Sequence, residues 1–71
     1  MSYKVDARGL SCPQPVVVAK RAVEGTKEKE IEVLVDNEAA RENVSRFARS
    51  VSCQVEVVPD GEDYSVRITR S

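Results

Sequence analysis

Apolar and polar residues alternate in three short segments of this 71-residue chain, and this pattern restricts its fold more than any other feature. The segments are residues 30–36, 53–57 and 64–68. A period of two is typical of a strand with one buried face and one wet face. In the stretches before and after the first of these segments, the apolar residues recur at helical spacing instead. The chain is therefore expected to form a sheet that is covered on one side by helices.

The first helix is predicted over residues 13–23. Pro13 and Pro15 fall in its first turn, where the N–H group that proline lacks is not required. Gly25 is a suitable C-terminal stop. The consecutive valines at 16–18 would also suit a strand. Apolar residues that recur at helical spacing favour the helix: Val16, Ala19 and Val23.

A second helix is predicted to follow the strand at 30–36. Asp36 or Asn37 serves as its N-cap, and Glu38 adds negative charge to its first turn. One stripe of this helix is apolar and is expected to face the core: Ala40, Val44, Phe47 and Val51. The intervening polar residues are expected to face water: Arg41, Glu42, Ser45, Arg46 and Arg49.

A first strand over residues 3–6 completes the order β-α-β-α-β-β. Two right-handed crossovers make the first three strands parallel, and a hairpin at Pro59-Asp60-Gly61 adds one antiparallel strand. The fold class is an α/β (α+β) two-layer sandwich, with a mixed four-stranded sheet and both helices on one face. Residues 1–71 are expected to form one domain. The open face of the sheet should carry polar residues: Glu32, Glu56, Arg67 and Thr69.

The charge balance argues against several classes of partner. The 11 basic and 12 acidic residues give a formal net charge of −1, which does not indicate a dedicated polyanion binder. Direct nucleic-acid binding is therefore not expected. No apolar run approaches the roughly 20 residues that span a bilayer, and the first residues lack the apolar stretch of a secretory signal. We expect a cytoplasmic protein with no membrane association.

The chain has two cysteines and no histidine. Two cysteines cannot supply the four ligands of a structural zinc site. The absence of imidazole also excludes a Cys-His pair, the commonest way to activate a catalytic thiol. No metal and no cofactor are therefore expected. Thiol chemistry here must take its activation from the backbone, from Arg or Lys, or from a partner protein.

Cys12 is the candidate reactive residue. If Pro13 is the first helical residue, Cys12 is the N-cap, and its sulfur lies beside unpaired N–H groups and the positive end of the helix dipole. Both features favour the thiolate, which is the nucleophilic form. The prolines leave mainly the N–H groups of Gln14 and Val16 to face the sulfur, and Arg8 could add positive charge. The alternative is that Cys12 is a small buried hydrophobe, which the proline-flanked helix start argues against.

Cys53 is expected to be a core residue, because it shares a strand face with Val55 and Val57. A Cys12–Cys53 disulfide is not expected. Cys12 follows the end of the first strand, whereas Cys53 opens the third strand, which is parallel to it. The two cysteines should therefore lie at opposite ends of the sheet, beyond the roughly 7 Å between Cα atoms that a disulfide spans.

The segment from Asp6 to Pro15 resembles the signature of the TusA/SirA-like sulfur-carrier family. Its hallmark is Cys-Pro-x-Pro near the N-terminus, preceded here by Asp-x-x-Gly-Leu. The resemblance extends over essentially the whole chain. Residues 35–48 further resemble the N-terminal domain of YedF-type proteins, a branch linked to selenium metabolism. One departure is Gln14, since relatives with a tRNA role often carry Glu between the two prolines.

The resemblance implies a sheet order of 1-2-4-3 and a persulfide-carrying sulfurtransferase that is not a stand-alone catalyst. The family cysteine, which matches Cys12, takes sulfane sulfur from a cysteine desulfurase and passes it to a downstream acceptor protein. Known routes lead to tRNA thiolation and to molybdenum-cofactor maturation. The residues expected to support Cys12 are Pro13, Gln14, Pro15, Arg8 and Gly9. Arg8 and Lys20 are further candidates for docking acidic partner surfaces.

Two other functions are compatible with the sequence. A non-catalytic regulatory or RNA/protein-binding module would use the open sheet face and the arginines of the second helix. Those arginines are interleaved with Glu38 and Glu42, which suits a solvated helix better than a phosphate groove. A redox sensor would need a reversible intramolecular disulfide.

Overall fold

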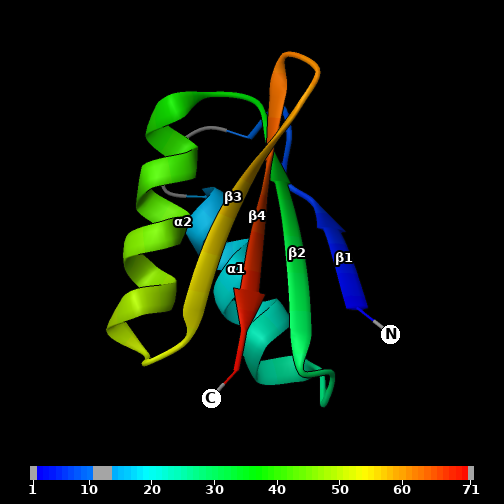
Figure 1. The fold of residues 1–71 in the computed structure, drawn as a ribbon, viewed down its shortest axis with the longest axis vertical. Helices are drawn as coiled ribbons and strands as arrows, with labels where there is room; N and C mark the ends of the chain where they lie inside the picture. Colours follow the sequence, from blue (N-terminus) through cyan, green and yellow to red (C-terminus); the bar gives the residue numbers. More distant parts are fainter. Residues whose placement is uncertain (1, 11–13, 71) are drawn as a thin grey trace.

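Two helices alternate with four strands in the predicted order (Figure 1). The computed structural model describes residues 2–10 and 14–70. The elements are β1 (Ser2–Asp6), α1 (Gln14–Gly25), β2 (Glu30–Val35), α2 (Glu38–Ser50), β3 (Gln54–Asp60) and β4 (Asp63–Thr69). Both helices cover one face of the sheet, so the two-layer prediction is confirmed. Neither of these helices is long and apolar enough to cross a membrane.

The sheet has the order β1-β2-β4-β3, as predicted. β1 is parallel to β2, and β4 is antiparallel to both of its neighbours, β2 and β3. The strands β1, β2 and β3 therefore run in the same direction. Their carboxyl ends meet at one edge of the sheet, together with the start of β4, and Arg8 and Gly9 follow β1 at this edge.

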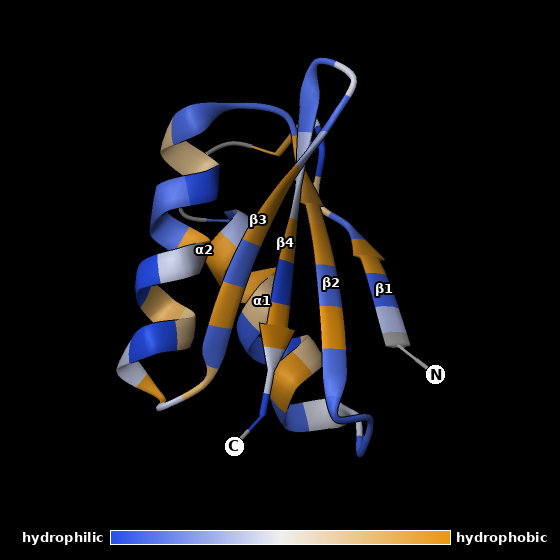
Figure 2. Ribbon diagram, viewed as in Figure 1, coloured by the Kyte–Doolittle hydropathy of each residue, from blue (hydrophilic) through white to orange (hydrophobic). Residues whose placement is uncertain are grey.

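The core lies between the sheet and the helices. Figure 2 shows the alternation of hydrophobic and hydrophilic residues along β2 and β4. The inward residues of these strands are almost fully buried, as the period of two predicts: Ile31, Val33, Val35, Val66 and Ile68. The buried line of α1 runs through Pro15, Ala19 and Ala22. It is rotated from the predicted Val16-Ala19-Val23 stripe, whose valines pack beside the core only half-buried.

α2 begins after the second of the two predicted caps and ends earlier than its apolar stripe suggested. Asn37 is the N-cap, and its side chain accepts a hydrogen bond of 2.7 Å from the backbone N–H of Ala40. At the other end, the prediction that Val51 faces the core is wrong. Val51 is the C-cap and remains 46% exposed, because Ser52 adopts a left-handed conformation with φ of 64° and turns the chain away.

Two further sequence predictions need correction. Ser45 was expected to face water but is 5% exposed, since its hydroxyl donates to the carbonyl of Arg41 at 2.8 Å and needs no water. Pro59 was assigned to the hairpin turn but lies within β3, opposite Tyr64. A proline is tolerated there because β3 is an edge strand. The turn itself follows Asp60 and contains Gly61, which has φ of 64°.

The open face of the sheet carries the polar residues predicted for it. Glu32 and Glu56 lie opposite Arg67 on the strands that flank β4. The guanidinium of Arg67 is 3.4 Å from the carboxylate of Glu32 and 3.9 Å from that of Glu56. This row of alternating charge keeps the uncovered face hydrated, which explains why the sheet needs no second helical layer.

Candidate functional site

The segment that joins β1 to α1 is the candidate functional site. Cys12 and Pro13 lie outside the described residues, as do the predictions that Cys12 is the N-cap and that Pro13 opens the helix. The structure describes the residues on either side. Arg8 and Gly9 follow β1 at the carboxyl edge of the sheet, and Gln14 is the first described residue of α1.

The first turn of α1 begins with one exposed and one buried residue. Gln14 is exposed, and Pro15 is buried against the core. No acidic residue lies in this first turn. The positive end of the helix dipole is therefore not offset by a carboxylate of its own helix. Pro15 fixes the helix start on the core, as a proline in a first turn does without the loss of a needed hydrogen bond.

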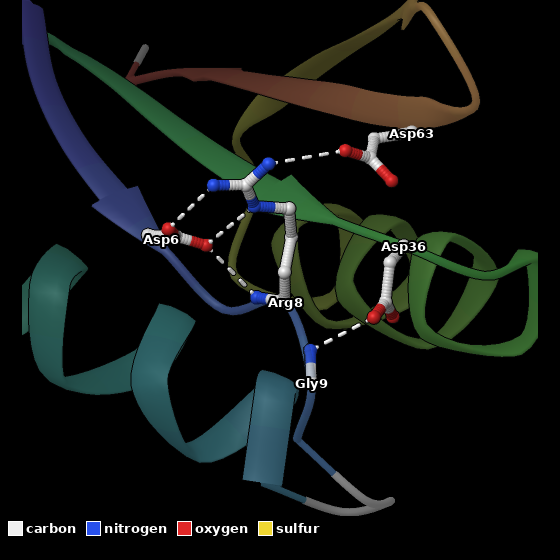
Figure 3. A network of polar contacts seen from close by, with 5 residues as sticks. All are labelled: Asp6, Arg8, Gly9, Asp36 and Asp63. Carbon is white, nitrogen blue, oxygen red and sulfur yellow. Dashed lines mark hydrogen bonds and ion pairs between the residues drawn. The ribbon is translucent and has the colours of Figure 1, made fainter.

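Gly9 ties the candidate segment to the start of α2 (Figure 3). Its backbone has φ of 76°, a left-handed conformation that glycine adopts without strain. Its N–H donates to a carboxylate oxygen of Asp36 at 2.8 Å. The other oxygen of Asp36 accepts from the side-chain amide of Asn37 at 3.0 Å. The residue that caps α2 and the turn before Cys12 are thus linked through one carboxylate.

The side chain of Arg8, just after β1, binds one carboxylate at the end of β1 and another at the start of β4 (Figure 3). Its backbone N–H and its Nε donate to one oxygen of Asp6, and its Nη2 donates to the other, all at 3.0 Å. Its Nη1 donates to Asp63 at 3.2 Å. The hydrogen bonds from the Arg8 side chain, then from its backbone, lower the pKa of Asp6. The carboxylates in turn raise the pKa of Arg8 well above its usual range.

These contacts give Arg8 a role that the sequence did not reveal. The sequence offered Arg8 as a possible source of positive charge near Cys12 without fixing the direction of its side chain, and the structure shows its guanidinium engaged by Asp6 and Asp63. Nothing in the sequence indicated Asp63, which is 55 residues away and reaches this edge only through the placement of β4.

The remaining sulfur and charge candidates are separate from this network. Cys53 is a free thiol, half-buried, and packs against the core as expected. Its Sγ lies 3.9 Å from the carbonyl oxygen of Val51, and this is at most a weak contact. Lys20 is exposed on α1. Within residues 2–10 and 14–70, no three of the Cys, Asp and Glu side chains are grouped so that they could hold a metal ion.

Comparison with known proteins agrees with the resemblance drawn from the sequence. The family described as Sulfurtransferase TusA matches residues 3–70. A protein of Methanocaldococcus jannaschii, named as a candidate sulfur carrier protein, is 44% identical over 48 residues, which are 66% of this chain and 64% of that protein. The match thus spans less than two thirds of that relative.

A solved structure is similar over almost the whole chain. The crystal structure of a SirA-like protein from Desulfitobacterium hafniense superposes with a TM-score of 0.83 and 35% sequence identity. The match covers 97% of this chain and 96% of that protein. The sequence profile, the relative and the fold point to the same group of proteins, so this chain belongs to the TusA/SirA-like family of sulfurtransferases and sulfur carriers.

Proposed function

We propose that this protein is a sulfur carrier that holds sulfane sulfur as a persulfide on Cys12. The observation that carries the proposal is the match to the sulfurtransferase family over residues 3–70, a range that includes Cys12 in its Cys-Pro-x-Pro motif. Cys53, the other cysteine, packs against the core. A half-buried core thiol is a poor carrier, because the transferred sulfur must be reached by two partners in turn.

The proposed transfer needs no oxidant and no metal. The thiolate of Cys12 attacks the outer sulfur of a persulfide on a cysteine desulfurase. A new S–S bond forms on Cys12 as the S–S bond of the donor breaks, and the donor cysteine leaves as a thiolate. A thiolate of the acceptor protein then attacks the outer sulfur on Cys12. Cys12 is released as a thiolate, and the carrier returns to its starting state.

The described residues support a backbone-based activation of this thiol. The first turn of α1 carries no carboxylate, so the amide dipoles there favour an anion at the helix start. Arg8 is held by two carboxylates, and we therefore assign it to the support of the segment and not to the direct stabilisation of sulfur. Gln14 is exposed at the first described position of α1, where its amide is available to donate to an anionic sulfur.

Incubation with a cysteine desulfurase and L-cysteine, followed by intact-protein mass spectrometry, tests the proposal. We expect a gain of about 32 Da, the mass of one sulfur atom, that reducing agent removes. Cys12→Ser should abolish the gain, and Cys53→Ser is the matched control that should retain it. A gain that depends on Cys53 would contradict the assignment of the site, and no gain on either cysteine would contradict the carrier function.

The acceptor protein determines which pathway receives the sulfur. We propose that the acceptor belongs to one of the routes known in the family. These are tRNA thiolation, molybdenum-cofactor maturation and a selenium-related pathway, the last suggested by the likeness of residues 35–48 to YedF-type proteins. Protein loaded with ³⁵S can be mixed with the acceptor proteins of each route. Movement of the label to one acceptor, absent when loading is attempted on Cys12→Ser, identifies the route.

A further inference from the structure

The helix α2 and the edge strand β3 lie beside each other (Figure 1). A positively charged groove of about 250 Å³ is lined by residues of both. The lining residues are Arg41, Glu42, Ser45, Arg46, Arg49 and Val57. These residues contribute three positive charges and one negative charge, in a chain whose formal net charge is −1. The groove is therefore a local concentration of positive charge on a nearly neutral protein.

The groove arginines differ from the arginines that support the fold. Arg8 and Arg67 are paired with carboxylates, and Arg70 donates to backbone carbonyls at the end of α1. By contrast, no ion pair joins the groove arginines to a carboxylate in residues 2–10 or 14–70. Glu42 is one helical turn from Arg46, yet the two make no such pair. The groove guanidinium groups thus retain their capacity to bind an external anion.

Arg41 is held in place without being neutralised. Its guanidinium carbon lies 5.0 Å from the centre of the Tyr64 ring, within the range of a cation–π contact. The contact with the ring does not neutralise the guanidinium, whose N–H groups can still donate hydrogen bonds to an anion. Because the side chain is already ordered, less conformational entropy is lost when a carboxylate binds.

We propose that this groove binds an extended acidic segment of a partner protein. Arginine and carboxylate groups match in shape as well as charge, since two N–H groups can donate to the two oxygens. Val57 supplies an apolar contact on the groove floor. β3 is the last strand of the sheet order, so its outer backbone groups face no other strand of the described sheet. An extended segment can pair with such an edge while its side chains reach α2.

The same groove is poorly suited to a nucleic-acid backbone. Glu42 lies among the arginines and would repel a continuous line of phosphates. A protein segment of mixed composition avoids this repulsion, because it can place a neutral or basic side chain beside Glu42. The charge pattern therefore favours a protein partner, and RNA binding becomes an outcome that the experiment can detect.

The test is an NMR titration of the ¹⁵N-labelled Cys12→Ser protein with an eight-residue peptide of alternating Glu and Val. The Cys12→Ser background separates this proposal from sulfur transfer, because binding in the groove does not need the thiol. We expect shifts in the β3 amides and in the Nε–H signals of the groove arginines. Arg46→Glu should weaken binding about tenfold, since it replaces a modest attraction by a repulsion of similar size.

Arg21→Glu, on the exposed part of α1, is the matched control with the same change of charge, and it should weaken binding less than twofold. The amide spectra of both variants show whether the fold is kept. An equal loss of peptide affinity in the two variants would mean that the attraction is non-specific, and it would overturn the proposal. Shifts outside α2 and β3, or tighter binding of a ten-nucleotide single-stranded RNA than of the peptide, would overturn it as well.

Discussion

Arg8 shows how one residue in the candidate segment can serve the fold and the site together. It binds Asp6 at the end of β1 and Asp63 at the start of β4, so it spans β2, which lies between these strands. Gly9 is the next residue and donates to Asp36. The two residues that lead into the motif are therefore anchored to β4 and to the start of α2. We expect the loss of these contacts to loosen the segment between β1 and α1 without unfolding the sheet.

The carboxyl group of Asp6 should titrate below the usual Asp value of about 3.9, because Arg8 donates to its charged form. Any stability from this contact is present above the pKa of an unfolded Asp and is lost as the pH falls through the lower folded pKa. Arg8→Ala should return the pKa of Asp6 toward its usual value. A ¹³C NMR titration of the Asp6 carboxyl measures this shift, and an unchanged pKa would contradict the assigned contacts.

At the scale of elements, both ends of α2 are closed by specific hydrogen bonds. Asn37 caps the start. At the other end, the N–H of Ser52 donates to the carbonyl of Arg49 at 3.1 Å, and the N–H of Cys53 donates to that of Ala48 at 3.0 Å. This is the Schellman pattern, in which glycine usually occupies the left-handed position. Serine occupies it here, so the sequence carried no glycine signal for the helix end.

Ser52→Gly should stabilise the protein by about 1 kcal/mol, because glycine adopts the left-handed conformation without the strain of a side chain. Urea denaturation of the two proteins measures the difference in the free energy of unfolding. Ser50→Gly is a suitable control, since Ser50 is the last residue of α2 and gains nothing from such a change. A Ser52→Gly protein that is less stable than the parent would contradict the strain argument.

Asn37→Ala should destabilise the protein by about 1 kcal/mol, the usual cost of losing an N-cap. The lost interaction is the hydrogen bond from the N–H of Ala40. Asn37→Asp keeps the acceptor and should retain most of the stability. Thermal unfolding followed by circular dichroism compares the three proteins, and equal stability of the Ala and Asp variants would argue against the capping role.

Arg70 closes the end of α1 from a distance. Its side chain donates to the carbonyl of Val23, one of the last helical carbonyls, which have no helical partner, and to that of Thr26, just beyond the helix. Arg70→Met keeps the aliphatic part of the side chain and should cost about 1–2 kcal/mol, since it removes charged hydrogen bonds. Hydrogen exchange should accelerate at the last turn of α1 more than in α2, and uniform acceleration would indicate a general loss of stability instead.

At the scale of the whole molecule, a small core limits how much change the protein tolerates. At 0.05–0.15 kcal/mol per residue, a chain of 71 residues has a total stability of about 4–11 kcal/mol. Ile31 is 1% exposed, so Ile31→Val should cost about 1 kcal/mol and Ile31→Ala about 2–5 kcal/mol. Val51→Ala, at a position 46% exposed, should change stability by less than about 0.5 kcal/mol. Denaturant titration ranks the three variants.

The sequence predicted the features that depend on local pattern. The inward faces of β2 and β4 followed from alternation, and cap chemistry placed the start of α2 at Asp36 or Asn37, of which the structure shows Asn37. The end of α2 was missed because Ser52 is not a typical left-handed residue. The contact from Arg8 to Asp63 depends on β4 entering between β2 and β3, and no local pattern contains that information. The groove beside β3 could not be predicted either, because it also depends on how distant segments pack together. Its arginines were noted only as a candidate surface.

The strand order has a consequence for how the protein is made. β4 is translated after β1, β2 and β3, yet it sits between β2 and β3 and pairs with both. While the ribosome still holds residues 63–69, β3 has no neighbour at all and β2 has one only on the side of β1. A nascent chain halted at the hairpin should therefore be degraded readily by protease, and resistance should arise abruptly once those seven residues clear the exit tunnel.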